Sequence, residues 1–288
     1  MVGQPGATDR SCAASVTEAP DVTVASDVTA AVRAAYNATG AAWDTGPRRV
    51  YDQLAIALLD RSPVELAGAL AVDAGAGTGA ATAELVRRGA RVAAVDLSTS
   101  MLRGITATTA AIGVAGDVVA LPVRSGAADI AVAAFVLNHL ARPADGLAEL
   151  GRVIRRGGVV LASVFGVGPS HPSKDAIDAI AVEYGYRPAP WYQRMKETYE
   201  AQVSDANELA GFATTAGLRD VIAEVVHVRP PMSASDLVSW RTGMAHLAPF
   251  VASLPVARAS ELTAAAVAAV TGMPPLDLAM LTLVARRP

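Results

Sequence analysis

The sequence of 288 residues has little of several features that mark particular classes of protein. It contains a single cysteine, Cys12, so no disulfide can form within the chain and a zinc site built on cysteines is excluded. It has no long run of lysine or arginine, and its formal net charge is −3. Because proteins that bind nucleic acids usually present a basic patch, DNA and RNA are not expected as partners.

Long apolar runs and clustered histidines are also missing. No stretch reaches the ~20 unbroken apolar residues of a membrane span. Residues 1–26 lack the basic start and apolar block of a signal peptide, and their composition predicts a disordered tail. The histidines stand apart, without the close pairs typical of metal sites. We therefore expect a cytoplasmic protein with no bound metal and no membrane-spanning segment.

What is present is a regular alternation of short apolar runs with longer amphipathic runs. Two helical patterns come first, between residues 27 and 60, and the second begins near Pro47. Strands are then predicted at residues 69–73, 91–95, 111–115, 130–135 and 159–165. Helices are predicted between them at residues 80–88, 98–109 and 144–155. This alternation predicts an α/β fold whose parallel sheet is covered by helices on both faces.

The pattern changes after residue 165. Residues 166–218 are predicted to form a loop followed by helices, and two late strands are predicted at residues 221–228 and 276–285. Two late strands would complete a doubly wound, mostly parallel seven-stranded sheet with a C-terminal antiparallel hairpin. We accordingly divide the chain into a tail, a core with N-terminal helices, a helical lid and a segment that completes the sheet. Their predicted bounds are 1–26, 27–165, 166–218 and 219–288.

The most informative motif lies between the first predicted strand and the first helix of the alternating region. It reads Val72-Asp73-Ala74-Gly75-Ala76-Gly77-Thr78-Gly79. Glycine suits a sharp turn and a close approach of backbone to ligand, and the helix start that follows favours an anionic group. The motif also satisfies G-x-G-x-x-A, so a dinucleotide site stays open at this point. Asp96, at the end of the second strand, could accept ribose hydroxyls in either kind of site.

Three further features separate these alternatives. Asp73 precedes the glycines, giving D-x-G-x-G-x-G. Gly116-Asp117 follows the third strand and leads into Ala120-Leu121-Pro122. The fourth strand runs into Phe135-Val136-Leu137-Asn138-His139-Leu140, and Arg155-Arg156-Gly157-Gly158 precedes the fifth. Over residues 69–165 the chain resembles the methyltransferase superfamily that uses S-adenosylmethionine (SAM) and has a Rossmann-like fold. The resemblance is to the group that includes ubiquinone and menaquinone methyltransferases.

The resemblance implies a set of residues that bind SAM. Gly75, Gly77 and Gly79 would line its methionine and ribose part, and Asp73 would reach the methionine ammonium. Asp96 would hold the ribose hydroxyls, and Asp117 would meet the adenine amine beside the backbone N–H of Val118. The remaining cofactor-binding candidates are Ala76, Leu97, Met101 and Phe135. Asp96 and Asp117 have a plainer interpretation, as turn or strand-end residues.

The candidates for proton transfer are two histidines. His139 should lie just past the fourth strand, where open α/β sheets bind ligands, and an imidazole that titrates near pH 7 could accept a proton. It could equally cap a helix or form part of the pocket wall. His171, on the loop after the fifth strand, is a weaker candidate, and His227 is expected to be structural.

Aromatic residues are few, yet several collect after residue 183, among them Tyr184, Tyr186, Trp191, Tyr192, Tyr199 and Trp240. They could line a substrate pocket or pack helices on the sheet. Tyr36, Trp43 and Tyr51 resemble, more loosely, positions in the helices that close over SAM in this group.

The resemblance favours a SAM-dependent methyltransferase that acts on a small molecule, possibly formed in secondary metabolism. Two alternatives stay open: a SAM-binding protein with a cyclase or regulatory role, and a nicotinamide-dependent reductase. A reductase would leave Asp117 without a role. The sequence leaves open the acceptor, its reacting atom and the oligomeric state.

Overall fold

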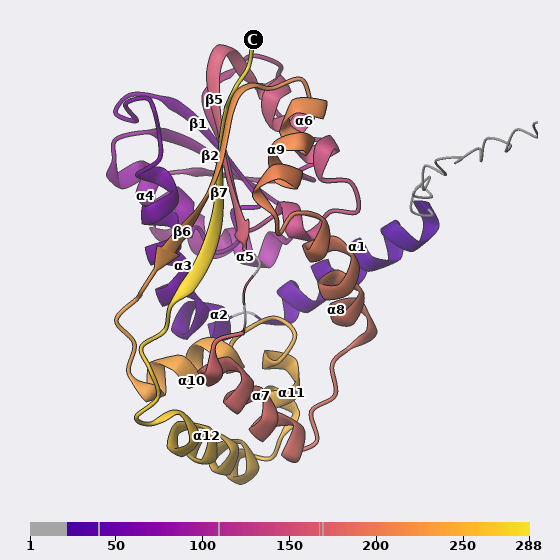
Figure 1. The fold of residues 1–288 in the computed structure, drawn as a ribbon, viewed down its shortest axis with the longest axis vertical. Helices are drawn as coiled ribbons and strands as arrows, with labels where there is room; N and C mark the ends of the chain where they lie inside the picture. Colours follow the sequence, from indigo (N-terminus) through magenta and orange to yellow (C-terminus); the bar gives the residue numbers. More distant parts are fainter. Residues whose placement is uncertain (1–21, 40, 109, 167, 169) are drawn as a thin grey trace, which may run out of the picture.

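The computed structural model describes residues 22–39, 41–108, 110–166, 168 and 170–288. Cys12 and residues 1–21 of the predicted tail lie outside this part of the chain. Within it, the strands form one sheet in the order β3-β2-β1-β4-β5-β7-β6 (Figure 1). The strands are β1 (Leu70–Ala74), β2 (Arg91–Asp96), β3 (Ile112–Ala115), β4 (Ala128–Ala134), β5 (Ile154–Phe165), β6 (Arg219–Val228) and β7 (Leu278–Arg286).

The first five strands pair in parallel, and β7 lies antiparallel to both β5 and β6. The predicted seven-stranded, mostly parallel sheet with a C-terminal antiparallel pair is therefore confirmed. The order reverses at β1 and β4, because β2 and β3 extend the sheet to one side of β1 while β4 extends it to the other. In open α/β sheets this reversal leaves a crevice at the carboxyl ends of the strands.

The helices of the first half are α1 (Val22–Thr39), α2 (Ala41–Thr45), α3 (Pro47–Leu59), α4 (Ala80–Arg87), α5 (Thr99–Thr108), the 3-10 helix η1 (Leu137–His139) and α6 (Pro143–Val153). Those of the second half are α7 (Pro172–Glu183), α8 (Pro190–Arg194), the π-helix η2 (Met195–Glu200), α9 (Ala206–Thr215), α10 (Ala234–Thr242), α11 (Ala248–Ser253) and α12 (Val256–Val270).

The central strands of the sheet are buried on both faces, and successive side chains of a strand point to opposite sides. In β4, Ile130 and Val132 pack with buried residues of α3 and α4. Ala131 and Ala133 pack on the other face with buried residues of α6 and α9. The fully apolar runs seen in the sequence follow from this burial on both sides.

Two predicted boundaries are wrong. The tail was predicted to reach residue 26, but α1 begins at Val22. The β-branched residues at the start of α1 are weak helix formers, so the sequence pattern does not predict that the helix begins there. The helix predicted over residues 144–155 ends at Val153, and Ile154 already pairs with Ala128 in the sheet before a register shift. The amphipathic pattern runs on past this point because Ile154 is apolar in either setting.

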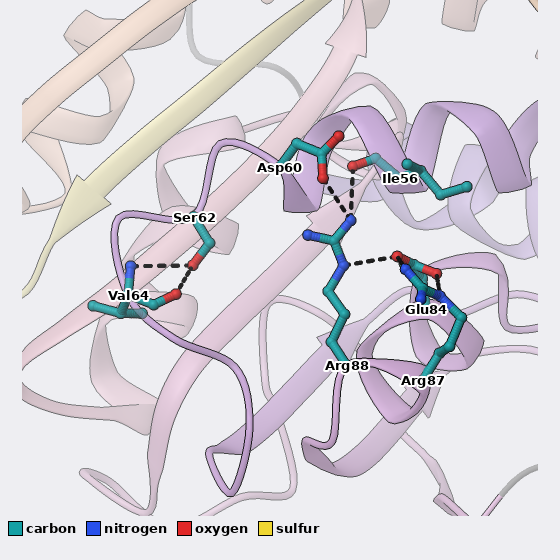
Figure 2. A network of polar contacts seen from close by, with 7 residues as sticks. All are labelled: Ile56, Asp60, Ser62, Val64, Glu84, Arg87 and Arg88. Atoms are coloured by element: carbon teal, nitrogen blue, oxygen red, sulfur yellow. Dashed lines mark hydrogen bonds and ion pairs between the residues drawn. The ribbon is translucent and has the colours of Figure 1, made fainter.

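Helices α3 and α4 are tied together at one end by Arg88 (Figure 2). Its guanidinium donates to the carboxylate of Asp60 at 2.7 Å and to the backbone oxygen of Ile56 at 3.4 Å. Its Nε donates to Glu84 of α4 at 2.7 Å. This contact fixes α3 beside α4, and so holds the start of α3 near the turn between β1 and α4.

Helices α7, α10, α11 and α12 lie together beyond the sheet, in the lower part of Figure 1. A partly buried ion pair joins two of them: Arg241 of α10 donates twice to the carboxylate of Asp178 in α7, both times at 2.6 Å. A planar guanidinium matches a carboxylate in this paired geometry. Across the described residues, no helix combines the length and the apolar character needed to span a membrane.

Candidate active site

The glycine-rich turn connects β1 to α4 in a conformation that glycine favours. Gly75, Gly77 and Gly79 have positive φ angles of 73°, 55° and 91°. The backbone N–H groups of Gly75 and Ala76 donate to the oxygen of Val95, at 2.7 and 3.0 Å, so the turn is fastened to the end of β2. A Cβ on Gly77 would meet no atom within 4 Å. Space has therefore been left beside the backbone at this residue.

That space is part of a cavity of about 420 Å³ at the carboxyl ends of the parallel strands. Its size falls in the usual range for small-molecule sites. Eleven of the thirteen residues singled out from the sequence lie on its wall: Asp73, Gly75, Ala76, Gly77, Asp96, Leu97, Met101, Asp117, Val118, Phe135 and His139. Gly79 and His171 are absent from that wall.

Asp96 supports the glycine-rich turn directly. One carboxylate oxygen accepts from the N–H of Gly77 at 2.8 Å, and the other accepts from the N–H of Ser98 at 2.7 Å. Burial raises the pKa of Asp96, and the backbone N–H groups that it accepts from oppose that rise. The plainer interpretation, a residue that organises a turn, thus describes part of what Asp96 does. It also lines the cavity, so both interpretations hold together.

Asp73 is buried, and one of its two carboxylate oxygens accepts no hydrogen bond from the described residues. Its Oδ2 accepts from the Thr82 hydroxyl at 2.5 Å, whereas its Oδ1 has no hydrogen-bond partner among the described residues. Burial raises the pKa of Asp73 to about 6. Buried polar atoms are nearly always paired, so this oxygen on the cavity wall is suited to a donor carried by a ligand.

Asp117 marks the far side of the cavity, after β3. Its carboxylate accepts from the N–H of Val119 at 3.1 Å, which holds a short turn. Gly116 has no room for a side chain, since a Cβ would come within 2.6 Å of Pro122. The carboxyl ends of β1, β2 and β3 thus bring Asp73, Asp96 and Asp117, in that order, to one cavity.

Gly79 does not line the cavity, contrary to the prediction. It is the N-cap residue of α4, and a Cβ there would come within 2.8 Å of Ile105. Gly79 directly precedes the first residue of α4, beyond the part of the turn that lines the cavity. The glycine is needed for the left-handed backbone and for packing, not for contact with a ligand.

His171 is not available as a base. Its Nδ1 accepts from the N–H of Ser173 at 3.2 Å, which caps α7. Its Nε2 donates to the backbone oxygen of Pro275 at 3.1 Å. Both ring nitrogens are therefore engaged in holding the loop, and His171 is not on the cavity wall, so the structure gives no support to the predicted catalytic role. His227, by contrast, pairs with Asp277 at 2.9 Å, as expected of a structural residue.

His139 lies on the cavity wall in η1. Its Nε2 is 3.4 Å from the hydroxyl of Tyr36, and its Nδ1 is buried without a hydrogen-bond partner in the described part of the chain. Burial lowers the pKa of His139 to about 4, far below the near-neutral value on which the prediction of a base relied. The imidazole is therefore neutral at pH 7 and only weakly basic.

The aromatic residues of the cavity come from the N-terminal helices and β4. Tyr36, Trp43, Tyr51 and Phe135 line it, whereas six later residues singled out from the sequence do not: Tyr184, Tyr186, Trp191, Tyr192, Tyr199 and Trp240. Of those six, Tyr192 stacks on the imidazole of His246, with ring centroids 3.9 Å apart, and Trp240 is buried among the helices. These aromatic residues pack helices, which was one of the two interpretations left open.

Arg48 is a residue that the sequence did not single out. From the first turn of α3, its guanidinium donates to the backbone oxygen of Thr78 at 2.9 Å and to that of Gly79 at 3.4 Å. Its Nε donates to Asp52 at 2.6 Å. Arg48 therefore holds the glycine-rich turn from outside the cavity. A local sequence pattern does not predict a contact such as that of Arg48 with Thr78, which are 30 residues apart.

We expect Arg48→Gln to loosen the glycine-rich turn. Hydrogen bonds to a charged group contribute roughly 1.5–3 kcal/mol, so amide exchange over residues 75–80 should rise by about tenfold or more. Hydrogen–deuterium exchange measures this in the ligand-free protein. Arg49→Gln is the matched control, because Arg49 pairs with Asp236 on the surface. Equal exchange in the two variants would contradict a role for Arg48 in holding the turn.

Comparison with known proteins gives one matching family model and relatives that include two enzymes of the same name. Residues 72–162 match the model of a methyltransferase domain. The chain is 31% identical over 180 residues to the demethylmenaquinone methyltransferase of Thermobifida fusca, a match that covers 60% of this chain and 73% of that enzyme. It is 36% identical over 123 residues to the enzyme of the same name from Corynebacterium kroppenstedtii, covering 43% of this chain and about half, 52%, of that relative.

A solved structure extends the likeness in fold. The phosphoethanolamine N-methyltransferase 2 of Haemonchus contortus, in complex with S-adenosyl-L-methionine, superposes with a TM-score of 0.52 at 17% identity. The superposition covers 82% of this chain and 52% of that one. At this identity the likeness concerns the fold alone.

Proposed function

The chain belongs to the class I family of SAM-dependent methyltransferases, and we propose that it transfers the methyl group of SAM to a small molecule. The observation that carries the proposal is the convergence of Asp73, Asp96 and Asp117 around the open backbone of Gly77, within one cavity. A sheet without ligand-binding function has no need for a buried carboxylate oxygen that lacks a partner.

The cavity residues fit the parts of SAM one by one. The unpartnered Oδ1 of Asp73 suits an ammonium group, such as that of the methionine part. Asp96 stands in the middle, where its carboxylate suits ribose hydroxyls, and the open side of Gly77 admits the ligand beside the backbone. Asp117 and Val118 suit the adenine, between the apolar side chains of Leu97 and Met101. The cavity therefore offers donors and acceptors in the order in which SAM presents its own.

When bound, SAM supplies a methyl group on a positively charged sulfur, which leaves as a neutral thioether. The chain's own residues then have three tasks: to align the acceptor, to exclude water, and to accept a proton where the acceptor carries one. In this proposal Tyr36 and Trp43 of the N-terminal helices close the cavity. Of the predicted lid, helices α8 and η2 pack against α1 and η1 and are the part that can gate access, whereas α9 packs on the sheet.

We propose a small, largely apolar acceptor. The cavity wall away from the carboxylates consists mainly of aromatic and aliphatic side chains, including Tyr51, Phe135 and Leu140. Relatives named demethylmenaquinone methyltransferase support a small-molecule acceptor, and the net charge of −3 gives no support to a nucleic acid.

The direct test is binding of SAM and its conversion to S-adenosylhomocysteine (SAH) with a panel of hydroxyl and amine acceptors. We expect Gly77→Val to abolish both, because its side chain would occupy the cavity next to the turn. Calorimetry and product detection by mass spectrometry measure the two steps.

Gly157→Val is the matched control. Gly157 also has a positive φ, of 73°, and open space where a Cβ would be, but it lies outside the cavity wall. The control should bear a similar backbone strain and still bind SAM. Binding of SAM by the Gly77 variant would contradict the proposed site.

We expect SAM affinity to depend on pH through Asp73. Pairing with an ammonium group needs the ionised carboxylate, and the pKa of Asp73 is about 6 in the free protein. About a tenth of it is ionised at pH 5 and about nine tenths at pH 7, so affinity should rise roughly tenfold over that interval. Asp73→Asn should bind more weakly and lose this dependence. A parallel pH profile in the variant would exclude Asp73 as the titrating group.

We propose that His139 shapes the wall and does not act as the base. With a pKa of about 4 it has little driving force to take a proton at pH 7. His139→Gln should therefore lower kcat by less than about tenfold and leave the pH–rate profile between pH 6 and 8 unchanged, since alignment carries the reaction. A fall of about 10²-fold, with loss of an inflection near neutral pH, would instead establish general base catalysis.

A further inference from the structure

We propose that four rings on the cavity wall bind the positive charge of the donor, so that the site holds a sulfonium more tightly than the neutral thioether left after transfer. The rings belong to Tyr36, Trp43, Tyr51 and Phe135, and we call them the aromatic wall. The inference rests on the proposed function and adds to it a device that distinguishes the cofactor from its product by charge.

The rings form a continuous row. The centroids of Tyr36 and Trp43 are 5.4 Å apart, those of Trp43 and Tyr51 are 5.1 Å apart, and those of Tyr51 and Phe135 are 5.3 Å apart. They come from α1, the α2 segment, α3 and the end of β4, so four separate elements converge on one surface. All four side chains line the cavity, and those of Trp43 and Phe135 are buried.

Phe135 is held in an unusual backbone conformation to join this row. Its φ is 58°, in the left-handed region that a bulky side chain rarely adopts. Its N–H donates to the backbone oxygen of Ser163 at 2.8 Å, which keeps it at the edge of the sheet. Strain of this kind costs free energy and gathers at functional sites. The strained backbone of Phe135 is therefore consistent with a ring that is held in position to contact a ligand.

The chemistry of the row suits a cation. Aromatic rings carry negative charge on their faces and attract a cation within about 6 Å, most strongly when water is excluded. Burial raises the pKa of Tyr36 and of Tyr51, so both phenols are uncharged and neither offers an ionised oxygen. Among the described residues the cation found over a ring is Arg258, at Tyr184, which is not part of the wall.

The neighbours of the row place it beside the donor's charge. Phe135 follows β4, whose Val132 pairs with Asp73 of β1. Tyr36 lies close enough to Asp96 for that carboxylate to add to the rise in the pKa of the Tyr36 phenol. The proposed methionine and ribose contacts therefore flank the wall. In the transfer, the acceptor's lone pair forms the new bond to carbon, the sulfur–methyl bond breaks, and its electron pair stays on sulfur. The positive charge leaves the sulfur, and the attraction to the rings ends.

The test compares three ligands that differ at this position. SAM carries a sulfonium, sinefungin carries a protonated amine, and SAH is neutral there. Dissociation constants are measured by calorimetry for the full chain and for Trp43→Leu and Tyr51→Leu. Tyr51→Phe keeps the ring without its hydroxyl. Phe165→Leu is the matched control, because Phe165 packs on Phe135, at 4.5 Å between centroids, but does not line the cavity.

We expect each leucine variant of the wall to lose about fivefold or more in affinity for SAM and sinefungin, while its affinity for SAH changes by less than about twofold. Tyr51→Phe and Phe165→Leu should keep the preference of the unmodified chain for the cationic ligands. Equal losses for all three ligands would overturn the inference, since the rings would then only pack. If the unmodified chain binds the three ligands without preference, the charge-sensing role fails and the proposed function stands. If it binds none of them, both fail.

Discussion

The turn between β1 and α4 is held from three directions. The carboxylate of Asp96 accepts the N–H of Gly77, and the backbone oxygen of Val95 accepts those of Gly75 and Ala76. The guanidinium of Arg48 donates to the oxygens of Thr78 and Gly79 from the far side. Glycine makes the turn sterically possible, but its conformational freedom also makes an unsupported turn costly to order. The shape of the cavity depends on these bonds, because Gly77 forms part of its wall and leaves space beside its backbone.

The same constraint explains why ionisable groups are buried around the cavity. Asp96 must lie at the end of β2 to reach the turn, and that position removes it from water, as its raised pKa shows. Asp73 is buried one strand away, and its pKa is raised to about 6. Two carboxylates in one apolar setting disfavour each other's ionised form. A ligand that brings positive charge and hydrogen-bond donors would relieve this cost, so the protein's own electrostatics select such a ligand.

The helices around the sheet serve the cavity in different ways. Helix α3 covers the sheet with Leu54 and Leu58 while its first turn carries Arg48 to the glycine-rich turn. The Arg88 contacts shown in Figure 2 hold that helix against α4. Helix α9 belongs to the predicted lid, residues 166–218, but it packs on β6 and β7 and completes the second face of the sheet. Support for the core and access to the site are thus divided among helices that look alike in the sequence.

The sequence by itself determined the sheet and the parts of the site that lie at strand ends. Strand and helix periodicity and the glycines of the turn act over a few residues, so they can be recognised locally. The strand-end carboxylates Asp73, Asp96 and Asp117 follow from the order of the strands, because parallel strands bring their carboxyl ends to one edge. Only the tertiary structure decided the rest. It engaged both nitrogens of His171, lowered the pKa of His139, brought Arg48 to the glycine-rich turn, and brought the aromatic wall to the cavity. Burial, pKa and contacts between distant helices depend on packing, and packing is set by the whole chain.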